Sequence, residues 1–205
     1  MKWKNKIFKE HSLTEFEDLT FEVYRYQIEH CEVYSNYVSA LGKSNPGDLE
    51  AIPFLPISFF KSKRIISNEF QESQIIFKSS GTEGIRSLHE LADIELYKAS
   101  FEYAYQKFVG SIENQVIIGL LPNYIEQGDS SLVYMVDSLM KKSKDKRSRF
   151  ILNDLEEIKN TLAQVQLTDK TLVLFGVAYS LLDLCGNDID LSETIVIETG
   201  GMKGK

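Results

Sequence analysis

The sequence predicts an α/β fold, a layered α/β/α arrangement around a largely parallel or mixed sheet. Two observations indicate this class. Four short segments rich in branched aliphatic residues have the composition of strands, and amphipathic helical stretches lie between most of them. A chain of 205 residues with 43% hydrophobic and 26% charged residues is long and apolar enough to bury a substantial core. We therefore expect a packed fold with one main domain.

The N-terminal part of the chain is predicted to be helical. Between Thr20 and Leu41, apolar and aromatic side chains recur at helical intervals, which predicts one long amphipathic helix. Residues 45–48 have turn chemistry. Pro53 and Pro56 are incompatible with a helix interior, so we expect the segment 52–60 to be an extended, partly buried connector.

The connector also carries bulky apolar side chains, namely Phe54, Leu55, Ile57, Phe59 and Phe60. They either line a pocket for an acyl chain or pack beneath the domain. Packing is the interpretation that the residues alone favour, because bulky apolar side chains fill any core.

The rest of the chain supplies the strands and helices of the predicted sheet. The strands are expected at 74–78, 115–121, 171–177 and 194–198, and the helices at 93–108, 130–142 and 154–165. A basic stretch at 141–149 follows one of these helices. Because cations suit a helix carboxyl terminus, a solvated helix end and loop is favoured there over an anion or partner site.

Composition excludes several classes of function. The formal net charge of −7 argues against a nucleic-acid-binding surface, which needs clustered Lys and Arg. Charges interrupt the first ten residues before a signal-peptide core can form, and no apolar stretch is long enough to span a bilayer. We expect a cytoplasmic protein without a membrane span. Cys31 and Cys185 lie far apart and combine with no histidine at ligand spacing, so neither a disulfide framework nor a metal site is predicted.

The most informative segment is a Ser/Gly-rich loop that follows the first predicted strand. Ser79-Ser80-Gly81-Thr82-Glu83-Gly84 combines two glycines with three hydroxyls, so backbone N–H and side-chain O–H groups are able to converge on phosphate oxygens. No Gly-Lys-Ser/Thr follows and no G-x-G-x-x-G is present, which excludes a Walker loop and a dinucleotide fingerprint. From composition alone, a tight turn and a phosphate-binding loop are equally good interpretations of this segment.

This loop resembles the Ser-Gly-Thr-Thr-Gly phosphate loop of the adenylate-forming enzymes, and the chain is most similar to their acyl-protein synthetase (LuxE-type) branch. The supporting segments, in the family's order, are 52–61, Ser87 and His89, 120–124, 128–135, 176–183 and 198–205. Together they are far more specific than the loop alone.

The resemblance implies that ATP and a carboxylic acid, specifically a fatty acid, form an acyl-adenylate, after which the acyl group passes to a thiol or protein acceptor. ATP and Mg²⁺ are the implied cofactors. The residues implied to hold the ATP phosphates are Ser79, Ser80, Gly81, Thr82 and Gly84. Gly200 and Gly201 resemble the adenine-binding turn, where a missing side chain lets the base approach the backbone.

Arg86 and His89 are the candidate catalytic residues. Glu83 stands where the superfamily has Thr or Ser, and no Lys ends the loop, so Arg86 is placed to supply the missing charge. His89 resembles a family position that is suited to touch the acyl or phosphate group. A surface arginine and a packing histidine are the structural alternatives. Asp129 or Ser130, before the helix at 130–142, is interpreted first as a capping residue, and Asp183 as a cap or a sheet-edge residue rather than a catalyst.

The resemblance also predicts the domain organisation: an N-terminal helical segment at 1–50 and an α/β nucleotide-binding core at 51–205. Family members continue into further motifs for ribose, Mg²⁺ and a mobile C-terminal domain, so the core is expected to be truncated, and 205 residues alone are expected to exchange little pyrophosphate into ATP. A non-catalytic binding or assembly module that retains the fold is the alternative.

Overall fold

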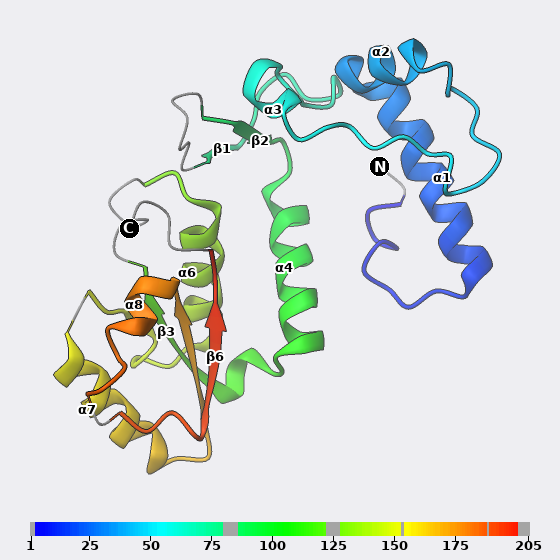
Figure 1. Ribbon diagram of the computed structural model, residues 1–205. Helices are drawn as coiled ribbons and strands as arrows, with labels where there is room; N and C mark the ends of the chain where they lie inside the picture. The colour runs from blue at the N-terminus through cyan, green and yellow to red at the C-terminus, as the bar shows by residue number, and fades with distance from the viewer. Residues whose placement is uncertain (1–2, 80–85, 122–127, 153, 188, 201–205) are drawn as a thin grey trace. The chain divides into compact units, whose positions relative to one another are not determined.

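The protein was analysed as a computed structural model that describes residues 3–79, 86–121, 128–152, 154–187 and 189–200 (Figure 1). The chain forms two compact units, Met1–Ser100 and Phe101–Lys205. The sequence predicted a different division, with a helical segment at 1–50 and a nucleotide-binding core at 51–205. That division is defined by function as well as by packing, so it stays a prediction. Within the described residues, no helix combines the length and apolarity needed to cross a membrane.

Two helices open the first unit, α1 (Leu13–His30) and α2 (Glu32–Ala40). A capping box starts α1, in which the Ser12 side chain accepts from the Glu15 N–H and the Glu15 side chain accepts from the Ser12 N–H. The single helix predicted between Thr20 and Leu41 is wrong, because Cys31 adopts an extended conformation with φ −118° and ψ 97°. Apolar periodicity continues through this break, since both helices face one core.

The core of the first unit joins the two helices to the connector. Tyr24 of α1, Val38 of α2 and Ile52 of the connector are buried together. From 51 to 58 the chain forms neither helix nor strand, as expected. The expectation is wrong for residues 59 and 60, which begin the one-turn helix α3 (Phe59–Ser62). The connector is partly buried, because Ile52 is buried whereas Phe54 is 86% exposed.

An antiparallel ribbon completes this unit. Strand β1 (Ile75–Lys78) pairs with β2 (Leu88–Leu91), with Phe77 opposite His89 and Lys78 opposite Leu88. The strand predicted at 74–78 is therefore present, but its partner is a strand that the sequence did not reveal. Because Leu-His-Glu-Leu contains no branched aliphatic residue beyond leucine, its composition is not typical of a strand.

The second unit confirms the predicted α/β class with a four-stranded parallel sheet in the order β4-β3-β5-β6 (Figure 1). Strands β3 (Gln115–Leu120), β5 (Thr171–Gly176) and β6 (Thr194–Glu198) lie where strands were predicted. Strand β4 (Arg149–Phe150) was missed because its two residues are too short to produce a pattern.

Helices cover both faces of this sheet, which confirms the layered arrangement. On one face, α7 (Leu155–Gln166) packs through Ile158 and Leu162 against Val116, Ile118 and other apolar residues of the sheet. On the other face lie α6 (Ser131–Ser143) and the C-terminal half of α4 (Ile94–Phe108), where the Tyr105 ring stacks on Phe175 with centroids 6.2 Å apart. The Ser130 side chain caps α6 by accepting from the Val133 N–H, so the capping interpretation is confirmed for Ser130.

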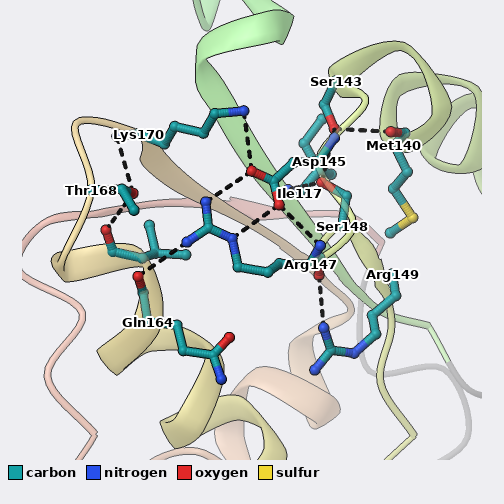
Figure 2. Close-up of polar contacts among 11 residues, drawn as sticks. Ile117, Met140, Ser143, Asp145, Arg147, Ser148, Arg149, Gln164, Thr168 and Lys170 are labelled. Carbon is teal, nitrogen blue, oxygen red and sulfur yellow. Dashed lines mark hydrogen bonds and ion pairs between the residues drawn. The ribbon is translucent and has the colours of Figure 1, made fainter.

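A polar network closes the edge of the sheet at which the strands begin (Figure 2). The Asp145 carboxylate accepts two hydrogen bonds from the Arg147 side chain, one from Nε at 2.9 Å and one from a terminal nitrogen at 2.8 Å. It also forms an ion pair with Lys170 at 3.1 Å. These contacts, above all those from Arg147, hold the pKa of the Asp145 carboxyl well below its usual range. Arg147 also donates to the Gln164 carbonyl near the end of α7. This part of the basic stretch is thus ion-paired structure rather than the solvated loop that was expected.

Candidate functional site

The order of the strands predicts a ligand site at the other edge of the sheet. From β3 the chain crosses to β4 on one side, and from β5 it crosses to β6 on the other. Such a reversal between two adjacent parallel strands is a topological switch point, and open α/β sheets bind ligands outside the carboxyl ends of their strands at that point. In this protein the switch point lies between Leu120 and Gly176.

Three of the sequence-predicted segments begin at this edge. The segments 120–124, 176–183 and 198–205 start at the carboxyl ends of β3, β5 and β6, respectively. The Thr199 N–H donates to the Gly176 carbonyl at 2.9 Å, so the ends of β5 and β6 are tied together. The described first residues of these segments, which are far apart in the sequence, therefore lie at the same edge of the sheet.

Gly200 lies in the turn that follows β6. Its φ of 75° is in the left-handed region, which glycine adopts without the steric cost of a Cβ. The resemblance assigned Gly200 and Gly201 to an adenine-binding turn, and Gly200 has a backbone conformation that favours glycine. Gly201 lies outside the described residues.

Two buried hydroxyls at this edge have no hydrogen-bond partner among the described residues. They are the Thr199 Oγ1, beside the Gly200 turn, and the Ser180 Oγ. Ser180 belongs to the short helix α8 (Ala178–Leu182), which follows β5. Because a buried hydroxyl without a partner carries a desolvation cost, each is a group that a polar ligand is able to satisfy.

A cavity of about 250 Å³ adjoins these strand ends, and Ser180 and Asp183 are the polar residues of its lining. Apolar residues of β3 and α7, among them Leu120 and Ile158, form the opposite wall. Asp183 also ends α8, in agreement with the capping interpretation. The cavity therefore combines a carboxylate and a hydroxyl with apolar walls, as small-molecule sites commonly do.

The first unit holds the second part of the predicted site, the Ser/Gly-rich loop. Its ends are joined at the base of the β1–β2 ribbon, where the Ser79 N–H donates to the Ser87 carbonyl at 3.1 Å and the Ser87 N–H donates to the Ser79 Oγ at 3.0 Å. The Arg86 Nε donates to the Ser79 carbonyl at 2.6 Å. Ser79, Ser87 and Arg86 thus close a hairpin loop, whereas Ser80, Gly81, Thr82 and Gly84 lie outside the described residues.

His89 lies on β2, and its ring stacks on Phe60 of α3 with the ring centroids 4.5 Å apart and the planes 17° apart. Next to it, Glu90 accepts two bonds from the Arg64 side chain, from Nε at 3.0 Å and from a terminal nitrogen at 2.9 Å. The Arg64 guanidinium accordingly lowers the pKa of the Glu90 carboxyl. Both interactions hold β2 against residues 60–64, so His89 has a packing partner as well as a position near the loop.

No group of three or more potential metal ligands is present within the described residues. Carboxylates of this chain therefore do not assemble a metal cage in the described part.

The comparisons with known proteins give one informative match. The chain is 33% identical over 70 residues to the long-chain-fatty-acid–luciferin-component ligase of Photorhabdus luminescens. The resemblance to the acyl-protein synthetases is confirmed. The matched residues make up 34% of this chain and 60% of that ligase. No family model and no solved structure matches the chain.

The chain thus spans less than two thirds of the length of the ligase that it matches. Sequence reasoning located the glycine turn and the loop, but it missed the orphaned hydroxyls of Thr199 and Ser180. Their only sequence signal is that each follows a strand. It also missed that Phe60 is the ring against which His89 stacks, because residues 29 positions apart in sequence meet only through the pairing of β1 with β2.

Proposed function

We propose that this protein is the nucleotide-binding part of a ligase that activates a carboxylic acid with ATP. A carboxylate oxygen attacks the α-phosphorus of ATP, the bond to the β-phosphate breaks, and acyl-adenylate and pyrophosphate form. A thiol of an acceptor then attacks the acyl carbon, and AMP leaves. Adenylation is needed because a carboxylate is a poor electrophile, whereas AMP is a good leaving group.

One observation carries this proposal: three segments that resemble the family's motifs start from adjacent parallel strands at the switch point of the sheet. That edge is where α/β sheets hold nucleotides and other ligands. The likeness to a fatty-acid ligase supports the same reaction class independently of the topology.

The residues at this edge are suited to the nucleoside part of ATP. The Gly200 turn allows a flat base to approach the backbone, and the Thr199 hydroxyl beside it needs a polar partner. Ser180 and Asp183 offer a donor and an acceptor to hydroxyl groups of a ligand in the adjacent cavity.

The Ser/Gly-rich loop is proposed to bind the triphosphate. Arg86, held at the base of the loop by its bond to Ser79, brings a positive charge that offsets phosphate charge. Mg²⁺ is proposed to arrive with the triphosphate and to neutralise the charge that develops on the leaving pyrophosphate. His89 is proposed to contact the acyl or phosphate group from the neighbouring strand.

Replacement of Gly81 by valine tests the phosphate-binding assignment. We expect Gly81→Val to weaken binding of MgATP about tenfold or more, because a bulky side chain keeps phosphate oxygens from the backbone N–H groups. The measurement is calorimetric titration of the purified protein with MgATP. Gly47→Val is the matched control, because a Cβ at Gly47 meets no atom within 4 Å.

The assignment is wrong if folded Gly81→Val binds MgATP as tightly as the parent. The reaction itself is measured as acid-dependent exchange of labelled pyrophosphate into ATP by the natural gene product. Exchange that does not depend on the acid would rule out carboxylate adenylation.

A further inference from the structure

An apolar cavity of about 370 Å³ lies within the first unit, apart from the cavity at the sheet edge. Its walls come from α1, from the start of α2, from the connector residues 52–55 and from Phe60 and Ile65. None of the residues that line it is charged. A volume of this size falls within the range of about 300–1,000 Å³ that is typical of small-molecule sites.

The hydroxyl groups on the cavity wall are all used within the protein. The Thr20 hydroxyl donates to the Phe16 carbonyl, the Tyr24 hydroxyl to the Lys43 carbonyl and the Tyr34 hydroxyl to the Pro53 carbonyl, each at 2.7 Å. Burial raises the pKa of Tyr34 to about 12, so that ring stays neutral. The tyrosines therefore present ring surface to the cavity, which favours an occupant with hydrocarbon and few polar groups.

The cavity borders the ribbon that carries the Ser/Gly-rich loop. Phe60 lines the cavity, and its ring stacks on His89 of β2 with centroids 4.5 Å apart. Two residues before His89, Ser87 closes the base of the loop by its bonds to Ser79. One wall of an apolar cavity thus leads directly to the strand that ends the predicted phosphate loop.

We propose that this cavity binds the alkyl chain of the acid substrate, with the carboxyl end directed toward His89. The inference rests on the proposed function, because only an acid that is adenylated must bring its carboxylate to phosphate. It also changes the interpretation of the connector. Ile52, Pro53, Phe54 and Leu55 line the cavity, so the connector contributes to a ligand site rather than only to packing.

The occupant is a hydrocarbon chain rather than a second protein surface, because the cavity walls are uncharged and their hydroxyls are already bonded within the protein. A hydrocarbon tail suits these uncharged walls, and a single carboxylate at its end is directed toward the ribbon at His89, on which the lining residue Phe60 stacks. A protein surface would instead bring several backbone polar groups, and the uncharged walls supply few partners for them.

The test is calorimetric titration of the 205-residue protein with saturated straight-chain acids that lengthen two carbons at a time, below their micellar concentrations and without nucleotide. Each methylene that enters the cavity should strengthen binding about fourfold, with a plateau once the cavity is full. Acetate is the chain-free reference.

Val23 lines the cavity and is half-buried, so Val23→Phe should fill space without enlarging the packed core. We expect it to weaken binding of the long acids about tenfold or more. Val33→Phe is the matched control, because Val33 is half-buried on α2 and does not line this cavity. Val23→Ala should enlarge the cavity and move the plateau to a longer chain.

The inference is overturned if the affinity of the parent does not rise with chain length, or if Val23→Phe and Val33→Phe have equal effects. It is also overturned if the acids fail to bind and the protein self-associates through this surface. Its failure is distinct from failure of the proposed function. MgATP binding with no chain-length dependence removes only the cavity assignment, whereas chain-dependent acid binding without MgATP binding removes only the proposed reaction.

Discussion

Single polar residues differ in this protein according to whether their hydrogen bonds are satisfied. Asp145 is a satisfied residue: its side chain is 11% exposed, and it accepts from Arg147 and pairs with Lys170. Thr199 is the opposite case, because its buried hydroxyl has no partner among the described residues. Removal of a hydrogen-bonded group leaves its partners without a hydrogen bond, which costs stability. Removal of a group that has no partner breaks no hydrogen bond. Stability measurements should separate the two.

Asp145→Asn is expected to lower the free energy of unfolding by about 1–3 kcal/mol, because Arg147 and Lys170 lose a carboxylate at a mostly buried position. Urea denaturation monitored by circular dichroism measures this change. Asp137→Asn is the control, since Asp137 pairs with Lys141 on an exposed helix surface and should matter by about 0.5 kcal/mol or less. Equal losses in the two variants would contradict a structural role for the Asp145 network.

At the scale of elements, close packing at the end of β5 determines where α8 lies. A Cβ added to Gly176 would meet the Leu181 side chain at 2.5 and 2.7 Å, so only a residue without a side chain allows α8 to fold back against the strand. Ser180 and Asp183, which line the cavity at this edge, are positioned by the same turn. The glycine therefore supports both the packing and the candidate site.

Gly176→Ala should destabilise the protein by about 1–3 kcal/mol, because the added methyl group forces Leu181 and α8 to shift. Thermal and urea denaturation give the change. Gly47→Ala, at a position where an added Cβ meets nothing within 4 Å, should change stability by about 0.5 kcal/mol or less. If Gly176→Ala is as stable as Gly47→Ala, then α8 is not held by this contact.

At the scale of the whole molecule, each compact unit has its own core and its own candidate ligand-binding features. In the first unit, the α1 and α2 helices and the connector surround the apolar cavity, and the ribbon carries the loop. In the second unit, the two edges of the parallel sheet differ in chemistry. Ion pairs close the edge at which the strands begin, whereas orphaned hydroxyls and a glycine turn occupy the other. We expect stability to depend on the first edge and ligand binding on the second.

Thr199→Val tests this division of roles. The variant keeps the shape of the side chain and removes only the unpartnered hydroxyl, so stability should change by about 0.5 kcal/mol or less. Affinity for MgATP should fall roughly two- to tenfold, the value of one hydrogen bond. Asp145→Asn should show the reverse, a loss of stability with unchanged affinity. Calorimetric titration and urea denaturation of both variants measure the four quantities, and an unchanged affinity in Thr199→Val would exclude its hydroxyl from the nucleotide site.

The local sequence pattern was sufficient to predict the bounds of those strands and helices that bury a regular apolar face. Strands β3, β5 and β6 and helices α4, α6 and α7 lie within one residue of their predicted bounds. The same reasoning missed the break at Cys31, because one extended residue does not interrupt the apolar spacing. It also placed the strand at 74–78 in the main sheet, since the composition of a strand says nothing about its partner.

The sequence by itself determined the α/β class, because residue types carry apolar periodicity. From its glycines and hydroxyls it also predicted a phosphate loop and an adenine turn, and these assignments stay predictions. Its resemblance to the acyl-protein synthetases was likewise carried by residues in order along the chain. Only the tertiary structure decided which of these residues meet. The carboxyl ends of β3, β5 and β6 share one edge because parallel pairing aligns strand ends that are far apart in sequence. The apolar cavity beside His89 exists because α1, α2 and the connector converge around it, and no local pattern encodes the volume that they leave.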